Sequence, residues 1–337
     1  MAFPSLSANA LIEALDEPAL VVEGGQTLAA NAAARALFGE AIVGRDLRFA
    51  IRHPQALQAI LAGEHRDLAL VGLANAAQPW HLSVRPIADN ASLVRLTDRS
   101  AAIAAERMRV DFVANASHEL RTPLATISGF AETLAEDGPL DEGARRKFGA
   151  TIHNEAARML RIIEDLMGLS RIEADRFVAP RDSIDLAAVA RIAAQQVAAL
   201  AERRGCTVEI VTGDASVTVI GDHAQLLQVA DNLVTNAVRY GCGANSSTVR
   251  IEVLRDGSRG VLRVIDQGDG IAANHLLRVT ERFYRVDPSR SRESGGTGLG
   301  LAIVKHIVER HRGTLDIRSR LGAGTTVEVR LPTPEGD

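Results

Sequence analysis

A histidine stands beside a carboxylate in the segment FVANASHELRTPL, residues 112–124. The two residues are His118 and Glu119, and Thr122 follows four positions after the histidine. One nitrogen of a neutral imidazole is a nucleophile toward phosphorus, and a neighbouring carboxylate can accept the proton of the other nitrogen or hold the tautomer. On a helix, residues four apart share a face, so the Thr122 hydroxyl is placed to orient a hydrolytic water.

A second group of polar residues lies on one face of a predicted helix over 222–240. Asn232, Asn236 and Tyr240 recur every four residues, and Arg239 lies beside them. An amide oxygen suits Mg²⁺, which keeps several waters and takes few protein ligands, and a cation suits phosphate. Asn236 is therefore the candidate metal ligand, and all four residues are candidate nucleotide contacts.

Two glycine-containing segments extend this nucleotide chemistry. In the first, DQGDG, the Asp266 carboxylate can accept a hydrogen bond from an adenine amino group, while Gly268 and Gly270 allow the backbone to approach closely. The second, GGTGLGLAIV, runs into a helix whose free N–H groups suit phosphates. It matches neither a Walker loop nor a dinucleotide fingerprint, because no GK[ST] and no βαβ unit accompany it. Its candidate contacts are Gly296, Thr297, Gly298, Leu299 and Gly300.

Between these segments lies a polar, arginine-rich stretch, residues 271–294. Its composition and its bounding glycines suit a lid that closes over a nucleotide. Phe283 and Arg285 are its candidate nucleotide contacts. Arg285, Arg290 or Arg292 is suited to meet the phosphates, and the sequence leaves open which one does.

Taken together, these motifs resemble the bacterial sensor histidine kinases. Residues 112–124 match that family's dimerisation and phospho-acceptor motif, and four nucleotide motifs follow in the family's order within 232–300. The resemblance implies a Bergerat-type ATP-binding domain, which these kinases share with gyrase, Hsp90 and MutL. It covers residues 100–332 strongly and the N-terminal part only loosely.

The resemblance also implies roles for single residues. His118 is the implied phospho-acceptor, Glu119 the general base and Thr122 a phosphatase determinant. In the nucleotide site, the implied roles are Mg²⁺ binding by Asn236 with Asn232 nearby, adenine recognition by Asp266, and phosphate contacts by Gly298 and Gly300. One departure is Arg239, where the family often has Lys, and a planar guanidinium meets phosphate with different geometry from a compact ammonium.

The phospho-acceptor motif lies in a predicted helical hairpin. Glycine and proline nearly vanish from 99–135 and 141–174, and the stop signal EDGP separates these stretches. The helix is expected to bend at Pro123, which cannot donate to the carbonyl of Glu119. Two helices leave one side of their seam uncovered, so we expect a homodimer with a four-helix bundle. The predicted seam residues are Leu120, Leu124, Ile127, Ala131, Leu134, Phe148, Ile152, Met159, Ile163, Leu166, Leu169 and Ile172.

Two mixed domains flank this hairpin, which is assigned to 99–176. Residues 8–98 are predicted to form two strands, two short helices at 32–38 and 54–61, and three strands, an order that resembles a PAS sensor domain. Pro54 suits the first turn of the second helix. The segment RHPQAL at 52–57 is similar to the PAS domain of phosphate-regulon sensor kinases. Residues 183–332 alternate between three helices, the last predicted from Thr297 to His311, and several strands, which predicts an α/β sandwich. The fold class is therefore a multidomain α+β protein with a PAS-like sensor domain, a dimeric hairpin and an ATPase domain.

Composition limits the other functional classes. The formal net charge of −4 gives no reason to expect nucleic-acid binding. No run of about 18 apolar residues predicts a transmembrane segment, and the first 15 residues lack a secretory pattern, so we expect a cytoplasmic location. Cys206 and Cys242 fit no metal or disulfide pattern and are expected to be reduced thiols.

The predicted activity is ATP-dependent autophosphorylation of His118, with Mg²⁺ as cofactor. The resemblance implies transfer of the phosphoryl group to an Asp of a response-regulator receiver domain, and phosphatase activity toward that regulator. The balance of the two activities stays open. One alternative is a scaffold with a degenerate ATPase fold, which predicts a damaged motif, and none is found. A chaperone- or repair-type ATPase would lack the histidine hairpin.

Overall fold

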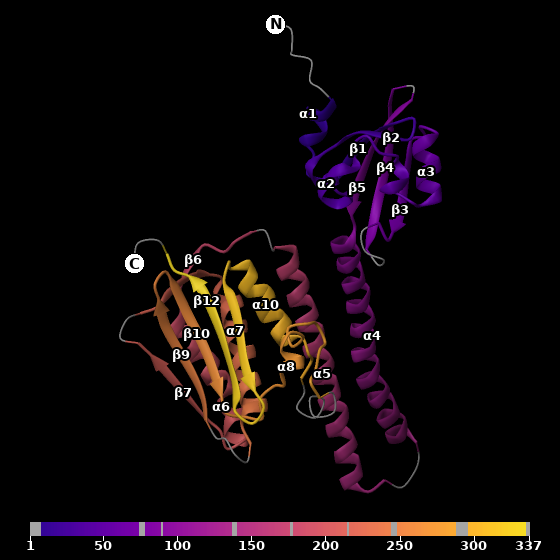
Figure 1. The fold of residues 1–337 in the computed structure, drawn as a ribbon. Coiled ribbons are helices and arrows are strands. Elements are labelled where there is room, and N and C mark those ends of the chain that lie inside the picture. Colours follow the sequence, from indigo (N-terminus) through magenta and orange to yellow (C-terminus); the bar gives the residue numbers. More distant parts are fainter. Residues whose placement is uncertain are drawn as a thin grey trace. The chain divides into compact units, whose positions relative to one another are not determined.

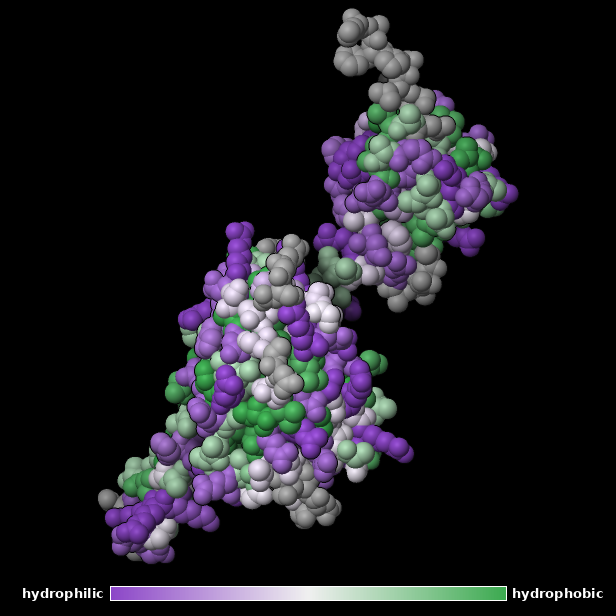
Figure 2. All heavy atoms as spheres, turned by 90° about the vertical axis from the view of Figure 1, so that its left-hand side faces the viewer, coloured by the Kyte–Doolittle hydropathy of each residue, from purple (hydrophilic) through white to green (hydrophobic). Residues whose placement is uncertain are grey.

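The computed structural model describes residues 8–73, 78–88, 90–136, 140–175, 178–213, 216–243, 248–287 and 296–334. The chain divides into two compact units, residues 1–111 and 112–337, and the helix α4 (Ser100–Ala135) runs through the division (Figure 1). Hydrophilic and hydrophobic residues are mixed on the face of each unit that Figure 2 shows. Of the segments singled out above, Asp137, Gly138, Pro139, Arg290 and Arg292 lie outside the described residues.

The N-terminal unit is built on a five-stranded antiparallel sheet with the order β2-β1-β5-β4-β3. The turn between β1 and β2 needs glycine, because Gly24 and Gly25 have φ angles of 54° and 87°. Helices α2 and α3 begin and end at the predicted residues, whereas the first helix, α1, and two short 3₁₀ helices were not predicted. The elements are α1 (Ala8–Glu13), β1 (Ala19–Glu23), β2 (Gln26–Ala30), α2 (Ala32–Phe38), η1 (Glu40–Ile42), η2 (Leu47–Phe49), α3 (Pro54–Leu61), β3 (Arg66–Val71), β4 (Pro79–Ala88) and β5 (Ala91–Asp98).

The hairpin consists of α4 and α5 (Glu142–Ala174), and α4 continues through Pro123 without interruption. Its seam was predicted only in part. Leu169 and Ile172 are buried as expected, but Ile162 is fully buried while its predicted neighbour Ile163 is 41% exposed. The predicted stripe is thus off by one residue at this turn of α5, whereas Leu169 and Ile172 pack into the core that the helix shares with the C-terminal domain. Leu124, also predicted at the seam, is 52% exposed in the single chain.

The C-terminal domain is a two-layer α/β sandwich. Its sheet has the order β11-β12-β10-β9-β7, in which only the pair β7–β9 is parallel. Three long helices, α6, α7 and α10, form one apolar core with this sheet. A small sheet pairs β6 with β8. The elements are β6 (Asp182–Asp185), α6 (Leu186–Arg203), β7 (Thr207–Thr212), β8 (Thr218–Gly221), α7 (His223–Gly241), β9 (Thr248–Asp256), β10 (Arg259–Asp266), α8 (Ala273–Leu276), α10 (Gly300–Arg310), β11 (Thr314–Arg320) and β12 (Gly324–Pro332).

One boundary in this domain differs from its prediction for a local reason. The last long helix was expected from Thr297 but begins at Gly300. Gly298 has a φ angle of 74°, which is incompatible with a right-handed helix, so the helix starts only after this residue. Residues 296–299, directly before the helix, are not helical.

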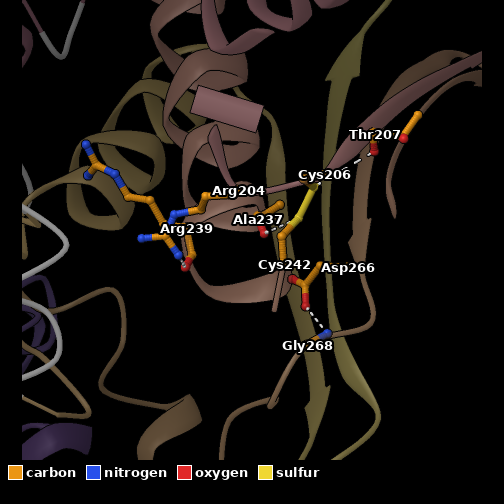
Figure 3. The surroundings of a disulfide bond; sticks show 8 residues. All are labelled: Arg204, Cys206, Thr207, Ala237, Arg239, Cys242, Asp266 and Gly268. Carbon is orange, nitrogen blue, oxygen red and sulfur yellow. Dashed lines mark hydrogen bonds between the residues drawn. A yellow bond between two sulfur atoms is a disulfide. The ribbon is translucent and has the colours of Figure 1, made fainter. Parts of the chain in front are cut away.

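The prediction of two reduced thiols was wrong, because Cys206 and Cys242 form a disulfide (Figure 3). Cys206 precedes β7, and Cys242 follows α7. Helices α6 and α7 pack side by side, which brings the two Cα atoms to 5.9 Å, a distance that a disulfide spans. The 36-residue separation along the chain did not reveal this proximity.

A buried histidine joins the end of α10 to the start of α7. His311 is 3% exposed, and its Nε2 accepts a hydrogen bond from the backbone N–H of Asp222, the N-cap of α7. The other ring nitrogen, Nδ1, lies 2.8 Å from the carbonyl of Ile307 and therefore carries the proton. Burial lowers the pKa of His311, with a smaller contribution from the charge of Arg310. The neutral ring thus holds α7, the helix with the asparagine face, in place.

We expect this histidine to make folding sensitive to acid. The unfolded chain binds a proton at His311 with a pKa of about 6.5, whereas the folded state binds it only at lower pH. The contribution of His311 to the free energy of unfolding is therefore complete above about pH 6.5, and it is lost as the pH falls toward and through the pKa of the folded state. Urea unfolding of wild type and His311→Gln at pH 8.0 and 5.5 measures it.

The difference in unfolding free energy between wild type and His311→Gln isolates this effect. The raised pKa values of Asp165, Asp231 and Asp266 change stability with pH in the opposite direction, but they do so equally in both proteins. At pH 8.0 the variant is expected to be less stable by about 1–2 kcal/mol. That gap should narrow toward pH 5.5. A gap that is independent of pH contradicts the assignment.

Candidate active site

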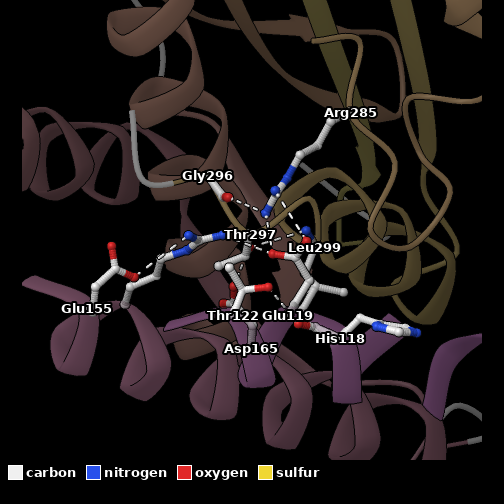
Figure 4. A network of polar contacts seen from close by, with 10 residues as sticks. His118, Glu119, Thr122, Glu155, Asp165, Arg285, Gly296, Thr297 and Leu299 are labelled. Atoms are coloured by element: carbon white, nitrogen blue, oxygen red, sulfur yellow. Dashed lines mark hydrogen bonds and ion pairs between the residues drawn. The ribbon is translucent and has the colours of Figure 1, made fainter. Parts of the chain in front are cut away.

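His118 is exposed on α4, and the adjacent Glu119 carboxylate binds two arginines (Figure 4). Glu119 Oε2 accepts hydrogen bonds from Arg158 of α5 at 2.9 Å and from Arg285 of the predicted lid at 3.0 Å. The His118 side chain points away from this cluster. The Thr122 hydroxyl donates to the His118 carbonyl oxygen at 3.3 Å. The structure therefore places the carboxylate of the histidine motif on two guanidinium groups.

Two residues of this region were missed by the sequence analysis. One is Arg158, and the other is Asp165, which accepts a hydrogen bond from the Thr297 hydroxyl at 2.7 Å. Burial is the main cause that raises the pKa of Asp165. Both lie on the buried stripe of α5, at helical spacing from Ile162 and Leu169. Both could have been found in the sequence as charged residues within an apolar stripe. They were missed because the seam was predicted one residue away.

A cavity of about 470 Å³ lies between α5, α7, the end of β10, the lid and the start of α10. Most of the predicted nucleotide residues line it. Phe283, Gly268 and Leu299 do not, and Arg161, Glu164 and Asp165 of α5 join its wall. The predicted residues that line the cavity are Asn232, Asn236, Arg239, Tyr240, Asp266, Gly270, Arg285, Gly296, Thr297, Gly298 and Gly300.

One end of the cavity presents the carboxylate of Asp266 at the end of β10. Its Oδ1 accepts the backbone N–H groups of Gly268 at 2.9 Å and Thr325 at 3.2 Å. Burial raises the pKa of Asp266, and these two hydrogen bonds oppose the shift. Both bonds use the same oxygen, so Oδ2 remains to accept a hydrogen from a ligand. This end of the cavity fits the amino edge of adenine.

Glycines bring α7 directly against this carboxylate. A Cβ atom on Gly268 would lie 2.5 Å from the Cα of Gly241 and 2.5 Å from the carbonyl oxygen of Tyr240. A Cβ atom on Gly241 would lie 2.3 Å from the Cβ of Asp266. Gly268 therefore supports the adenine end by close packing and not by direct contact.

A substitution at Gly268 is expected to disturb this packing. Gly268→Ala should destabilise the domain by about 1–3 kcal/mol, because the contacts of the new methyl group are backbone atoms that must move. It should also weaken ATP binding through the displaced Asp266. Thermal unfolding with and without ATP measures both effects. The control is Gly213→Ala, whose methyl group would meet nothing within 4 Å. Equal stability of the two variants contradicts the prediction.

Phe283, which does not line the cavity either, ties the lid to the start of α10. The backbone N–H of Phe283 donates to the carbonyl of Gly298 at 2.8 Å. A Cβ atom on Gly298 would lie 2.9 Å from the Cα of Phe283. The Phe283 ring also lies 5.9 Å, between centroids, from the ring of Phe112 on α4. Phe283 thus joins lid, helix start and hairpin.

Three arginines, Arg161, Arg239 and Arg285, also line the cavity, and α10 begins at Gly300 on its wall. Carboxylates line it as well, among them Asp231. Burial is the main cause that lowers the pKa of Arg239; the nearby Arg161 adds to this shift and Asp231 opposes it. A polyphosphate would add negative charge beside these arginines and at the helix N-terminus.

The donor set also limits how a metal would be held. Asn236 lines the cavity, and in the described part of the chain no cluster of three or more His, Cys, Asp or Glu side chains could hold a metal ion. Mg²⁺ commonly takes one or two protein ligands together with phosphate oxygens and water. The cavity therefore fits Mg²⁺ that arrives with a nucleotide.

Comparisons with known proteins agree with this arrangement. Residues 108–175 match the family model of the His Kinase A (phospho-acceptor) domain, and residues 221–335 match that of the histidine kinase-, DNA gyrase B- and HSP90-like ATPase. Apart from residues 108–111, both matched regions lie in the compact unit that contains His118 and the cavity. The chain belongs to the bacterial sensor histidine kinases.

The chain is similar to individual sensor kinases over most of its length. It is 36% identical over 288 residues to the phosphate regulon sensor protein PhoR of Pseudomonas aeruginosa, covering 84% of this chain and 63% of that protein. It is 36% identical over 243 residues to the sensor-like histidine kinase SenX3 of Mycolicibacterium smegmatis, covering 72% of this chain and 62% of that protein. The chain thus spans less than two thirds of the length of these relatives.

Solved structures show the same fold. The histidine kinase ThkA, in complex with the response regulator TrrA, aligns with a TM-score of 0.54 at 18% identity, covering 98% of this chain and all of that one. The Acinetobacter baumannii histidine kinase AdeS gives a TM-score of 0.51 at 22% identity over 65% of this chain and 98% of that one. Among the described residues of this kinase, no helix is long and apolar enough to cross a membrane.

Proposed function

We propose that this chain is an autokinase that transfers the γ-phosphoryl group of ATP to His118. The carrying observation is the contact between Glu119, the carboxylate next to His118, and Arg285, which lines the nucleotide cavity. One residue of the lid thus reaches both the histidine motif and the cavity. Bound ATP supplies the phosphoryl group and Mg²⁺ neutralises its charge, while the chain supplies position and electrostatics.

The residues of the cavity take separate tasks in this reaction. Asp266 would accept a hydrogen bond from the adenine amino group, and Asn236, with Asn232 beside it, would hold Mg²⁺. Arg239, the lid arginine Arg285 and the N-terminus of α10 at Gly300 balance phosphate charge. Tyr240 and the glycine-rich turn close the cavity around the nucleotide, as its lining indicates.

The chemical step uses the histidine motif. One ring nitrogen of His118 forms a bond to phosphorus as the bond to ADP breaks, and the proton of the other ring nitrogen passes to Glu119. Exposure of His118 leaves its ring accessible to a phosphoryl donor. The carboxylate must be free to accept a proton at that moment.

We further propose that a response-regulator receiver domain takes the phosphoryl group from His118 on an Asp residue. The complex of ThkA with its regulator TrrA is an example within the same fold. Thr122 is the candidate determinant of phosphatase activity. Its hydroxyl donates to its own helix here, so orienting a water requires rotation about the Cα–Cβ bond.

Two features support a homodimer with a regulatory N-terminal domain. Leu124, Leu160 and Met167 of the hairpin are 52–57% exposed in the single chain, and a second hairpin in a four-helix bundle would cover such residues. The strand order β2-β1-β5-β4-β3 supports a PAS-like domain at 8–98. We assign 99–176 to the dimerisation hairpin and 183–332 to the ATP-binding domain, and we expect the protein to act in the cytoplasm.

Incubation with γ-labelled ATP and Mg²⁺ tests the proposed activity. Label that is stable to base and labile to acid indicates phosphohistidine, and α-labelled ATP should give none. The rival function is a scaffold that binds ATP without transferring its phosphate. Tight ATP binding without any protein label would favour that scaffold.

A further inference from the structure

Glu119 is held by two arginines that are both almost completely buried. The side chains of Arg158 and Arg285 are 8% and 7% exposed, and that of Glu119 is 27% exposed. Arg158 donates to Oε2, and Arg285 donates to both carboxylate oxygens, at 3.0 and 3.4 Å. Two positive charges therefore meet one carboxylate, with Glu155 3.9 Å from Arg158 on its far side.

The two arginines differ in what else they touch. Arg158 lies in the middle of α5, a regular helix, and does not line the nucleotide cavity. Arg285 belongs to the lid, lines the cavity and also donates to the carbonyl of Gly296 at 2.6 Å. A nucleotide phosphate in the cavity is a competing partner for Arg285 but not for Arg158.

Both guanidinium groups retain an unsatisfied donor. The Nε–H groups of Arg158 and Arg285 are buried and have no hydrogen-bond partner. A buried donor without an acceptor is unfavourable, so an additional anion at this position would be stabilised. For Arg285, the phosphates of a nucleotide in the adjoining cavity provide such an anion.

We propose that Arg158 is a positioning residue for Glu119: it holds the carboxylate in place on α4 when bound nucleotide withdraws Arg285. This proposal rests on the proposed autokinase function. With both arginines bound, three donor contacts occupy the carboxylate. When Arg285 leaves, Oε1 is released to take the proton of His118, whose ring points away here and must turn toward the carboxylate. The remaining bond from Arg158 to Oε2 keeps the carboxylate from moving into solvent.

The test separates the rate constant of autophosphorylation from the KM for ATP. Arg158→Met is expected to lower the rate constant about 10- to 100-fold, because a displaced catalytic group costs that order of rate. Its KM for ATP should stay within about twofold of wild type, since Arg158 does not line the cavity. Arg158→Lys should recover most of the rate, because Arg158 makes a single hydrogen bond to Glu119.

Arg285→Met is the contrasting variant and should raise the KM for ATP as well as lower the rate. The matched control is Arg146→Met, which removes an exposed arginine of the same helix, paired with Glu142. It should leave both parameters unchanged. This difference in the KM for ATP between the two variants is expected only if Arg285 contacts the nucleotide and Arg158 does not.

A Glu119→Gln background distinguishes positioning from a merely structural role for Arg158. If Arg158 positions Glu119, Arg158→Met should cause no further loss of rate in that background, because the group that it positions is gone. A further loss of the full size there overturns the proposal, as does an unchanged rate in Arg158→Met itself. If Arg158→Met fails to fold, Arg158→Lys is compared in both backgrounds, with a smaller loss expected only where Glu119 is present. Absence of phosphohistidine in wild type would instead refute the autokinase function.

Discussion

Replacing His118 by Gln is expected to abolish autophosphorylation while ATP still binds with wild-type affinity. Gln has no ring nitrogen to form a bond with phosphorus, so the rate should fall at least about 1000-fold. His118 is exposed and does not line the cavity, so affinity for ATP should stay within about twofold. Label incorporation and calorimetric titration with ATP measure the two quantities.

His153→Gln is the matched control, because His153 is another exposed histidine of the hairpin. It should retain the label of wild type. Retention of label in His118→Gln would show that the phosphate resides elsewhere in the chain. Loss of ATP binding in that variant would show that the substitution disturbs the ATP-binding domain.

The second large effect is expected for Asp266→Asn, which should weaken ATP binding about 100-fold. The Asn oxygen can still accept the N–H groups of Gly268 and Thr325, so the fold should be retained. The amide NH₂ then takes the place of Oδ2 and faces the adenine amino group, donor against donor. A mismatched polar pair of this kind costs a few kcal/mol.

Calorimetric titration with ATP and with GTP measures this effect. Asp256→Asn, which removes an exposed carboxylate at the end of the neighbouring strand β9, is the control. Unchanged ATP affinity in Asp266→Asn, at unchanged stability, would remove the adenine contact from the proposal. A loss of stability in Asp266→Asn equal to that of Gly268→Ala would instead indicate a packing role for Asp266.

The sequence was sufficient for features that depend on local patterns. Helix α3 was predicted with Pro54 in its first turn, and the bounds of both α2 and α3 were predicted to the residue. The four nucleotide residues predicted on one side of α7 all line the cavity. Periodicity and turn chemistry determine such features within a few turns of chain.

Features that depend on contacts between residues distant in the sequence could not be predicted from the sequence. Arg158 meets Glu119 across 39 residues, and the pairing follows only once the two helices pack. Cys206 and Cys242 were expected to be free, because their pairing depends on how α6 and α7 lie together. Phe283 and Leu299 were expected to touch the nucleotide, whereas one ties the lid to the helix start and the other is fully buried in the core.

The position of Glu119 is the main addition to the sequence-based account. The sequence placed Glu119 directly after His118, where a base is needed. In the structure the carboxylate is bound by two arginines, one of which lines the nucleotide cavity. Nucleotide binding and release of the base are thereby linked through Arg285.

The central claim is that His118 receives the phosphoryl group of ATP. Wild-type protein is incubated with ATP and Mg²⁺, digested at alkaline pH and analysed by fragmentation mass spectrometry, with a sample without ATP as control. The account predicts the mass of one phosphoryl group on His118, within the segment FVANASHELRTPL, and none on other residues. A phosphoryl group on another residue, or ATP-bound protein without any phosphorylation, would contradict it.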